Sequence, residues 1–515
     1  MATSEHYDVI IIGTGAGGGT LAHRLAPSGK KILILERGAF LPKEKDNWNT
    51  SAVFRDGKYQ TNEVWADRKG NDISPGMNYW VGGNTKFYGG ALFRLREQDF
   101  EEVTLSEGVS PAWPLKYSDF EAYYDEAEAL YQVHGKWGLD PTEPPRHGDY
   151  PFPPVSHEPR IAQLDKAFQK KGLKPFYLPL SIKLNEKDMF LSECIRCNTC
   201  DGFPCFIDAK SDADISCIRP TMGKENVHLI TEAKVNRLHT SASGKEITGV
   251  EAEVEGEKHI FSADVVVVAC GAVNSAVLLL NSANEQHPDG LANSSNQVGR
   301  NFMKHLAAAI VGLTLKENKS VFQKTLAIND YYWGEPGFEY PMGHVQLLGK
   351  VNHRMLALDV PKIAPTLALR TAAKRTVDWW LTGEDAPDPN NRVVVKNGKI
   401  TLNYTPNNMK AFKRLIKRWI SVVREVDNQG SVLPLSWYFS KILPIGAIAH
   451  QVGTCRFGTD PASSVLDLNC KAHDIDNLYV VDGSFFPSSA AVNPSLTIMA
   501  NAMRVGDHLI ERLAS

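Results

Sequence analysis

The chain has 515 residues, of which 43% are hydrophobic and 22% are charged, a composition typical of a globular protein with two or more domains. Lys and Arg number 56 against 59 Asp and Glu, and no long basic run is present, which argues against nucleic acid as a partner. No apolar stretch reaches the roughly eighteen residues that a membrane helix needs, so we expect no transmembrane segment.

The first forty residues predict a βαβ unit. YDVIIIG (7–13) reads as a strand, GGTLAHRLAPSG (18–29) as a helix, and KKILILERG (30–38) as a second strand. The early strand follows neither a basic segment nor a small-residue cleavage site, which favours a cytoplasmic location, although export carried by a partner subunit would leave no trace.

A glycine motif, Gly13-x-Gly15-x-x-Gly18, lies between this first strand and helix. In a dinucleotide fold the first glycine permits the tight turn, the second lets the backbone approach a pyrophosphate, and the third packs helix on strand. Glu36 ends the next strand, where an acid accepts ribose hydroxyls. The motif therefore predicts a dinucleotide site, although the acid does not separate FAD from NAD, and a glycine turn with a surface glutamate is the structural alternative.

The central part of the chain predicts loops, then a return to the first sheet. Residues 39–93 are polar and lack periodicity, and the apolar spacing over 112–132 indicates an amphipathic helix with Ser118 as its N-cap. The further elements expected up to residue 283 are strands at 228–238, 247–256 and 259–270 and a helix at 272–283.

From about 305 to 440 the pattern changes to longer alternating strands, which predict an antiparallel sheet. They include a hairpin at Asn397–Gly398 in RVVVKNGKITLNY, followed by a helix from Met409. A strand at 477–484 and a helix from Pro494 end the chain. We expect an α/β protein with a discontinuous cofactor domain (1–110, 206–300 and 441–515) and an inserted substrate domain (111–205 and 301–440).

The C-terminal third carries motifs that resemble a known family. The segments HQVGTCRFG (450–458), VVDGS (480–484) and NPSLT (493–497) occur in the order and spacing of the glucose–methanol–choline (GMC) flavoprotein oxidoreductases. YDVIIIGTGAGG, VGGNTKFYGG, ACGAVNSAVLL and NRVVV fit the same family, so the resemblance covers nearly the whole chain. It implies a Rossmann-like FAD-binding domain in the GMC fold.

The resemblance also implies a set of FAD contacts beyond the glycine motif and Glu36. These residues are Gly83, Asn84, Thr85, Val235, Asp482, Gly483, Pro494 and Ser495. Structural alternatives are an ordinary strand valine at Val235 and a cap of the final helix at Asp482. Pro494 suits the first position of a helix whose N-terminus faces the flavin. The loop after Gly83 holds no histidine, so we expect non-covalent FAD.

By the same resemblance, His450 is the active-site base and Asn493 its partner over the flavin. Alcohol oxidation by hydride transfer requires loss of the hydroxyl proton, which a histidine can accept while an amide holds the substrate oxygen. A structural histidine is the alternative for His450. We expect oxidation of a sugar, glycoside or other polyol or cyclic alcohol, with oxygen, quinone or a redox protein as the unknown acceptor. The rivals are an enzyme for apolar or aromatic alcohols and a flavin-binding electron-transfer subunit.

Half of the eight cysteines lie in CIRCNTCDGFPC, namely Cys194, Cys197, Cys200 and Cys205. The C-x2-C-x2-C-x4-C spacing resembles a segment of some bacterial GMC proteins. Related sugar dehydrogenases bind an iron–sulfur cluster through cysteines in a comparable region, with a different spacing. Three cysteines so spaced can hold a cubane. We expect iron–sulfur ligands that pass electrons from reduced flavin to an acceptor. A disulfide, a redox dithiol, reduced structural thiols and zinc stay open.

Overall fold

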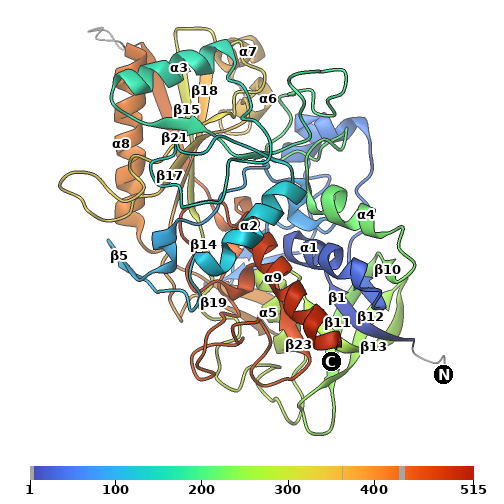
Figure 1. Ribbon diagram of the computed structural model, residues 1–515. Coiled ribbons are helices and arrows are strands. Elements are labelled where there is room, and N and C mark those ends of the chain that lie inside the picture. Colours follow the sequence, from blue (N-terminus) through green and yellow to red (C-terminus); the bar gives the residue numbers. More distant parts are fainter. Residues whose placement is uncertain (1–4, 362, 429–434, 515) are drawn as a thin grey trace.

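The computed structural model describes residues 5–361, 363–428 and 435–514, and its two large sheets lie at opposite ends of the molecule (Figure 1). The first sheet has the order β10-β2-β1-β13-β12-β11, with β23 beside β13. Its strands are β1 (His6–Ile12), β2 (Ile32–Leu35), β10 (Val227–Ile230), β11 (Ala233–Thr240), β12 (Ile247–Val254), β13 (Glu257–Val268) and β23 (Leu478–Val480).

The parallel part of this sheet is the cofactor-type layer that the sequence predicts. β1 pairs in parallel with β2 and β13, with Val9 opposite both Ile32 and Val265. Apolar residues fill both faces, which is expected when helices cover a parallel sheet. On one side α1 (Ala16–Leu25) packs against α9 (Ser495–Ala514), which packs against α2 (Ser118–Leu130), while α5 (Ala272–Asn281) contacts β11.

Two local expectations are corrected. The strand expected at 228–238 is two strands, because Glu232 has a φ of 54° and turns the chain from the parallel strand β10 into the antiparallel strand β11. Ser118 is the first residue of α2 rather than its N-cap, and the N-cap position holds Tyr117 without a side-chain capping bond.

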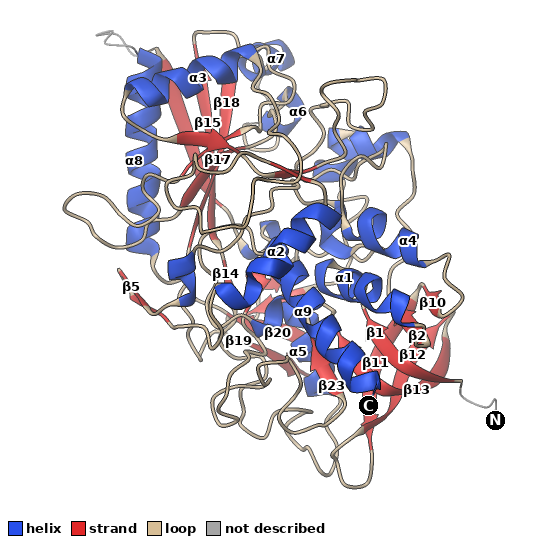
Figure 2. Cartoon of the chain, viewed as in Figure 1, coloured by secondary structure: helices blue, strands red, loops and turns tan. Residues whose placement is uncertain are grey.

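The second sheet is the predicted antiparallel one, with the order β21-β15-β18-β17-β16-β8. Its strands are β8 (Pro175–Tyr177), β15 (Leu306–Thr314), β16 (Leu326–Ile328), β17 (His344–Leu347), β18 (Thr376–Gly383) and β21 (Ser436–Ile442). Helices α3 (Pro159–Lys170) and α8 (Met409–Asn428) lie along the same end of the molecule (Figure 2). Trp379 and Trp419 join Phe168 in the apolar core between them and the sheet.

The hairpin predicted at Asn397–Gly398 is present but belongs to a different sheet. Both residues have positive φ, 49° and 75°, as the two-residue turn between β19 (Arg392–Lys396) and β20 (Lys399–Asn403) requires. β20 pairs with β3 (Trp65–Asp67), which pairs with β4 (Asp72–Ile73). This small sheet therefore joins the loop-rich segment after β2 to the middle of the chain.

The remaining elements are short. They are β5 (Val103–Leu105), β6 (Gly108–Ser110), β7 (Val133–His134), β9 (Leu180–Ser181), β14 (Met303–Lys304), β22 (Gln451–Val452), α4 (Arg219–Thr221), α6 (His353–Leu356) and α7 (Thr366–Ala373), with single turns of 3₁₀ or π helix between them. Within the described ranges, no helix is both long and apolar enough to cross a bilayer.

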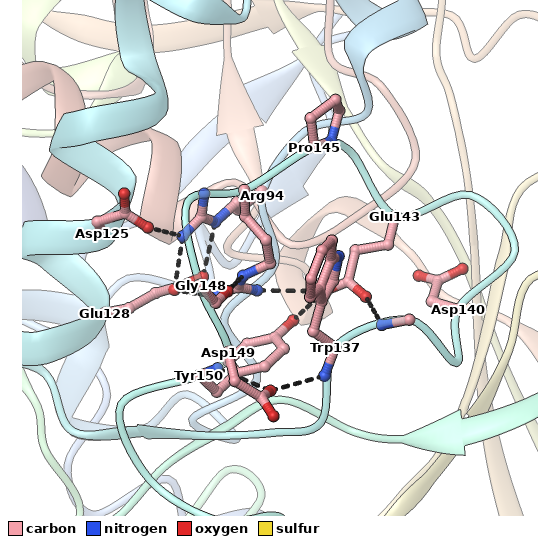
Figure 3. Close-up of polar contacts among 12 residues, drawn as sticks. Arg94, Asp125, Glu128, Trp137, Asp140, Glu143, Pro145, Gly148, Asp149 and Tyr150 are labelled. Atoms are coloured by element: carbon pink, nitrogen blue, oxygen red, sulfur yellow. Dashed lines mark hydrogen bonds and ion pairs between the residues drawn. The ribbon is translucent and has the colours of Figure 1, made fainter.

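A buried ion network fastens the loop after β7 to α2 (Figure 3). Arg94 donates to both carboxylate oxygens of Glu128, at 2.8 and 2.7 Å, and Arg146 contacts the same carboxylate. The three side chains are at most 2% exposed. Two guanidinium groups therefore share the Glu128 carboxylate away from water, and each has a second carboxylate partner, Asp125 for Arg94 and Glu143 for Arg146.

Candidate active site

A cavity of about 1580 Å³ extends between the two large sheets. Ligand pockets commonly have volumes of roughly 300–1,000 Å³, so this one has room for a dinucleotide and a substrate. Every cofactor and catalytic residue expected from the sequence lines it except Gly18, namely Gly13, Gly15, Glu36, Gly83, Asn84, Thr85, Val235, His450, Asp482, Gly483, Asn493, Pro494 and Ser495.

The first two motif glycines differ in the room that each has for a side chain. A Cβ atom on Gly13, whose φ is 102°, would lie 2.5 Å from the carbonyl oxygen of Ala269. A Cβ on Gly15 meets no atom within 4 Å, since this residue is the N-cap of α1 and faces the cavity. Gly15 has no side-chain cap, so the first N–H groups of α1 are available to a phosphate. The turn fits a dinucleotide.

The paired-glycine loop lies against this turn. A Cβ on Gly83 would lie 3.2 Å from the Cα of Gly15, and the backbone N–H of Gly82 donates to the Thr14 hydroxyl at 2.9 Å. Thr85 accepts from the N–H of Ala213 at 3.0 Å. The loop is therefore held at the entrance to α1 from both of its ends.

Glu36 is held at the end of β2 by the same turn. Its Oε2 accepts from the Thr14 N–H at 3.0 Å and from the Thr14 hydroxyl at 2.6 Å, while Oε1 accepts from Gly38 at 2.9 Å. Burial raises the pKa of this carboxyl, and the three donors oppose that rise. The acid is thus fixed at the cavity edge, where the sequence motif places a ribose contact.

Asp482 supports the site through its neighbours. One oxygen accepts from the Gly271 N–H at 2.9 Å and the other from the Ser484 N–H at 2.8 Å, so it caps the short helix at Gly483–Phe485. The alternative considered from the sequence, a cap of the final helix, is not what the carboxylate does. These bonds hold the Gly483 backbone at the cavity wall.

The start of α9 differs by one residue from the expected arrangement. The helix begins at Ser495, and Pro494 precedes it, with its carbonyl accepting from Ile498 at 3.1 Å. Pro494 therefore occupies the cap position instead of the first helical position. Asn493 lies before it on the cavity wall, and its buried Oδ1 has no hydrogen-bond partner. An unpaired buried amide oxygen is costly unless a ligand supplies the donor.

His450 faces a second histidine that the sequence did not single out. Its Nδ1 lies 3.0 Å from Nδ1 of His305, whose Nε2 lies 2.9 Å from the carbonyl oxygen of Ser489. Burial, together with the neighbouring His305, lowers the pKa of His450 to about 3. Burial lowers the pKa of His305 to about 4. In the sequence His305 is a lone histidine ahead of an alternating strand, with no motif to mark it.

On the antiparallel sheet, side chains on one face pack in the core and side chains on the other face line the cavity. On β18 Trp379 packs in the core against α8 and Trp380 lines the cavity, and on β15 Ala308 and Ala309 divide in the same way. Three aromatic residues between β16 and β17, Tyr331, Tyr332 and Trp333, do not line the cavity. The wall near Trp380 is largely apolar, with Val311, Leu313, Leu348, Val351, Leu356, Leu358, Leu369 and Phe439.

The cysteine-rich segment forms part of the cavity wall, and the structure does not support it as a metal site. Asn198, Asp201, Gly202 and Phe203 line the cavity, whereas the four cysteines are free thiols, two buried and two partly buried. Burial raises the pKa of the Cys194 thiol to about 12. Across the described part of the chain, no three His, Cys, Asp or Glu side chains gather as metal ligands. The expected iron–sulfur ligands are therefore not supported.

Comparisons with known proteins agree with this geometry. Two family models described as GMC oxidoreductase match residues 77–307 and 400–502. The 6'''-hydroxyparomomycin C oxidase of Streptomyces lividus is 30% identical over 541 residues, covering 99% of this chain and 92% of that protein. Paromamine 6'-oxidase of Streptomyces fradiae is 28% identical, covering 97% and 90% of the two chains, and the fructose dehydrogenase large subunit of Gluconobacter japonicus is 25% identical, covering 98% of each.

A solved structure has the same fold. The pyridoxine 4-oxidase from Mesorbium loti superposes with a TM-score of 0.66 at 18% identity and covers 98% of this chain and 99% of its own. The matched residues include β10 to β13 and β23 of the first sheet, β8 and β21 of the second, and the loops that carry His450 and Asn493. The chain therefore belongs to the GMC oxidoreductases, and it is an FAD-linked enzyme that acts on CH–OH groups.

Proposed function

We propose that the enzyme oxidises one hydroxyl group of a sugar, glycoside or other polyhydroxylated or cyclic alcohol to a carbonyl, with His450 as the base and Asn493 orienting the substrate oxygen. One observation carries the proposal: His450 and Asn493 line the same cavity as the dinucleotide turn, and each has a polar atom without a partner. In the described part of the chain, Nε2 of His450 makes no hydrogen bond.

The residues around the dinucleotide turn would hold FAD, which supplies a hydride acceptor when bound. Gly13 and Gly15 would receive the pyrophosphate and Glu36 the ribose. Val235, in β11, would contact the adenine. The rest of the cofactor would be contacted by the remaining predicted residues, Gly83, Asn84, Thr85, Asp482, Gly483, Pro494 and Ser495. The loop that follows Gly83 has no histidine, which supports non-covalent binding.

Proton removal is the part of the reaction that this chain performs itself. A neutral imidazole within reach of the substrate can take the hydroxyl proton, and a positioned base contributes roughly 10²–10⁴-fold in rate. The low pKa of His450 keeps the imidazole neutral at ordinary pH, so that one ring nitrogen has a free lone pair. The amide of Asn493 would hold the same hydroxyl oxygen, so that the proton points at His450.

The relatives support the polyhydroxylated class. Proteins named for oxidation of 6'''-hydroxyparomomycin C and paromamine, and for dehydrogenation of fructose and 2-methyl-1,2-propanediol, match 97% or more of this chain. A second candidate is an apolar or aromatic alcohol. It is favoured by one observation, the apolar wall around Trp380, Leu348 and Phe439.

The test is anaerobic reduction of the bound flavin by individual alcohols. Fructose, paromamine, 2-methyl-1,2-propanediol, benzyl alcohol and a long-chain alcohol are added at equal concentrations while the flavin absorbance is recorded. Bleaching by the first three alone supports the proposal, and bleaching by the last two alone supports the second candidate. If no alcohol bleaches the flavin, alcohol oxidation is wrong for this chain.

A further inference from the structure

We propose that His305 is a positioning residue that holds His450 in one tautomer, with the hydrogen on Nδ1 and the lone pair on the Nε2 that faces the cavity. This inference rests on the proposed role of His450 as the base. It adds the reason why that histidine presents an acceptor to the substrate.

The hydrogen assignment follows from a carbonyl group. The oxygen of Ser489 can only accept, so Nε2 of His305, 2.9 Å away, must carry a hydrogen. A neutral imidazole has one N–H, which leaves Nδ1 of His305 as an acceptor. The 3.0 Å contact between the two Nδ1 atoms then requires the hydrogen to be on His450. The other ring nitrogen of His450 is therefore unprotonated.

The argument requires a neutral His305, and its surroundings provide that. The side chain is 1% exposed and, among the described residues, has no carboxylate partner. Burial lowers the pKa of His305 to about 4, although backbone contacts with Ser489 and Ala490 oppose this shift, and the ammonium of Lys304 disfavours a second positive charge. The alternative, a cationic His305 that donates to His450, would place a charge in a buried site without compensation.

The backbone fixes both histidines at this distance. His305 follows β14 and His450 precedes β22, and these two strands pair with Met303 opposite Val452. The N–H of His305 also donates to the carbonyl of His450 at 3.3 Å. Ser489 lies in the loop that ends at Asn493. The bond from His305 to the Ser489 carbonyl therefore links the histidine pair to the segment that carries Asn493, the proposed partner of His450.

The tautomer matters because of the proton balance of the reaction. The substrate O–H bond breaks, its proton moves to Nε2 of His450 and a C=O bond forms. Bound FAD would supply the acceptor for the hydride that leaves the carbon. The substrate loses two electrons and two hydrogens. The imidazolium that results keeps its Nδ1–H bond to Nδ1 of His305, which stabilises the new charge. A His450 protonated on Nε2 would face the substrate with a donor and could not take the proton.

Two variants distinguish the ability of residue 305 to accept a hydrogen bond from His450 from its role in packing. In His305→Gln the amide oxygen can accept from His450 and the amide N–H can donate to Ser489, whereas His305→Leu offers neither. We expect flavin reduction within about 10-fold of the wild-type rate for Gln. For Leu we expect a loss of about 10²–10⁴-fold, the range of a general-base contribution. FAD content should be unchanged in both.

The spectroscopic readout is independent of turnover. In holoenzyme labelled with ¹⁵N-histidine, the resonance of Nε2 of His450, assigned by its loss in His450→Gln, should be that of an unprotonated ring nitrogen in the wild type and in His305→Gln. In His305→Leu it should shift towards the protonated type. A protonated Nε2 in the wild-type enzyme, or wild-type reduction by His305→Leu, overturns the inference. Wild-type reduction by His450→Gln instead overturns the proposed base, whatever the tautomer.

Discussion

A Cβ atom added to Gly18 would lie 2.0 Å from the carbonyl oxygen of Gly13, so the first turn of α1 rests directly on the end of β1. Gly15, between them, faces open space. The same motif therefore contains one glycine required for packing and one that leaves open the space where we propose that the phosphates bind.

This difference predicts two separable phenotypes. Gly18→Ala must displace backbone and should lower the thermal unfolding midpoint of the apoprotein. Gly15→Ala should leave that midpoint unchanged, yet weaken FAD binding, because its methyl group occupies the space next to the helix N-terminus. Apoprotein melting and FAD titration measure the two effects. Equal FAD affinity in Gly15→Ala and wild type would contradict the placement of the phosphate site.

The buried network in Figure 3 predicts a large stability effect at a site remote from the cavity. Glu128→Gln removes the charge that Arg94 and Arg146 share, while Arg94 keeps its contact with Asp125 and Arg146 keeps its contact with Glu143. Loss of hydrogen bonds to a buried charged group costs about 1.5–3 kcal/mol. Glu126→Gln is the matched control, because its partner Arg24 and Glu126 itself are 31% and 46% exposed. We expect a clearly lower thermal midpoint for the first variant only. Similar midpoints for the two variants would count against the network.

The lowered pKa of His450 predicts an acid-tolerant reaction. With a pKa of about 3, against roughly 6.5 for a free histidine, the base stays neutral as the pH falls through the usual histidine range. The rate of flavin reduction should therefore stay flat down to about pH 5. A loss of rate centred near the ordinary histidine pKa would show that the pKa of the base is not lowered.

The same pKa predicts a pH dependence of stability. Below roughly 6.5 the unfolded histidine binds a proton that the folded one refuses, so stability falls as the pH drops from about 6.5 towards 3. His450→Gln removes this contribution and should lose less of its thermal midpoint than wild type between about pH 7 and 5. An exposed control, His259→Ala, should behave as wild type.

The cysteine-rich segment predicts an order of reactivity. Cys197 and Cys205 are partly exposed, while Cys194 is buried with a pKa raised to about 12 by that burial. An alkylating reagent should therefore label Cys197 and Cys205 before Cys194, as followed by mass spectrometry. If all three thiols resist alkylation and the protein contains stoichiometric iron, the iron–sulfur hypothesis would be supported after all.

Features set by local physics could be predicted from the sequence. The glycine turn, the Asn397–Gly398 hairpin and the long amphipathic α8 each depend on residues close in the chain, and the structure contains all three. Long-range pairings were not predictable. Nothing near the hairpin indicates that β20 pairs with β3, and no local pattern marks the turn at Glu232.

The same difference between local and long-range features applies to the residues of the site. His450 and Asn493 lie in motifs, so the sequence could assign them roles, whereas His305 acquires its significance only through a contact across 145 positions of the chain. The aromatic pair Trp379–Trp380 illustrates the same limit, because which of the two lines the cavity depends on the orientation of β18 relative to α8.

The central claim is that His450 takes the proton of an alcohol while the hydride goes to FAD. The most direct measurement is stopped-flow reduction of the flavin under anaerobic conditions, with the alcohol that bleaches the wild-type enzyme, comparing wild type, His450→Gln and the control His259→Ala. We predict that His450→Gln retains FAD but reduces it at least about 10²-fold more slowly, with the control unchanged. Reduction of the flavin by His450→Gln at the wild-type rate would contradict the account.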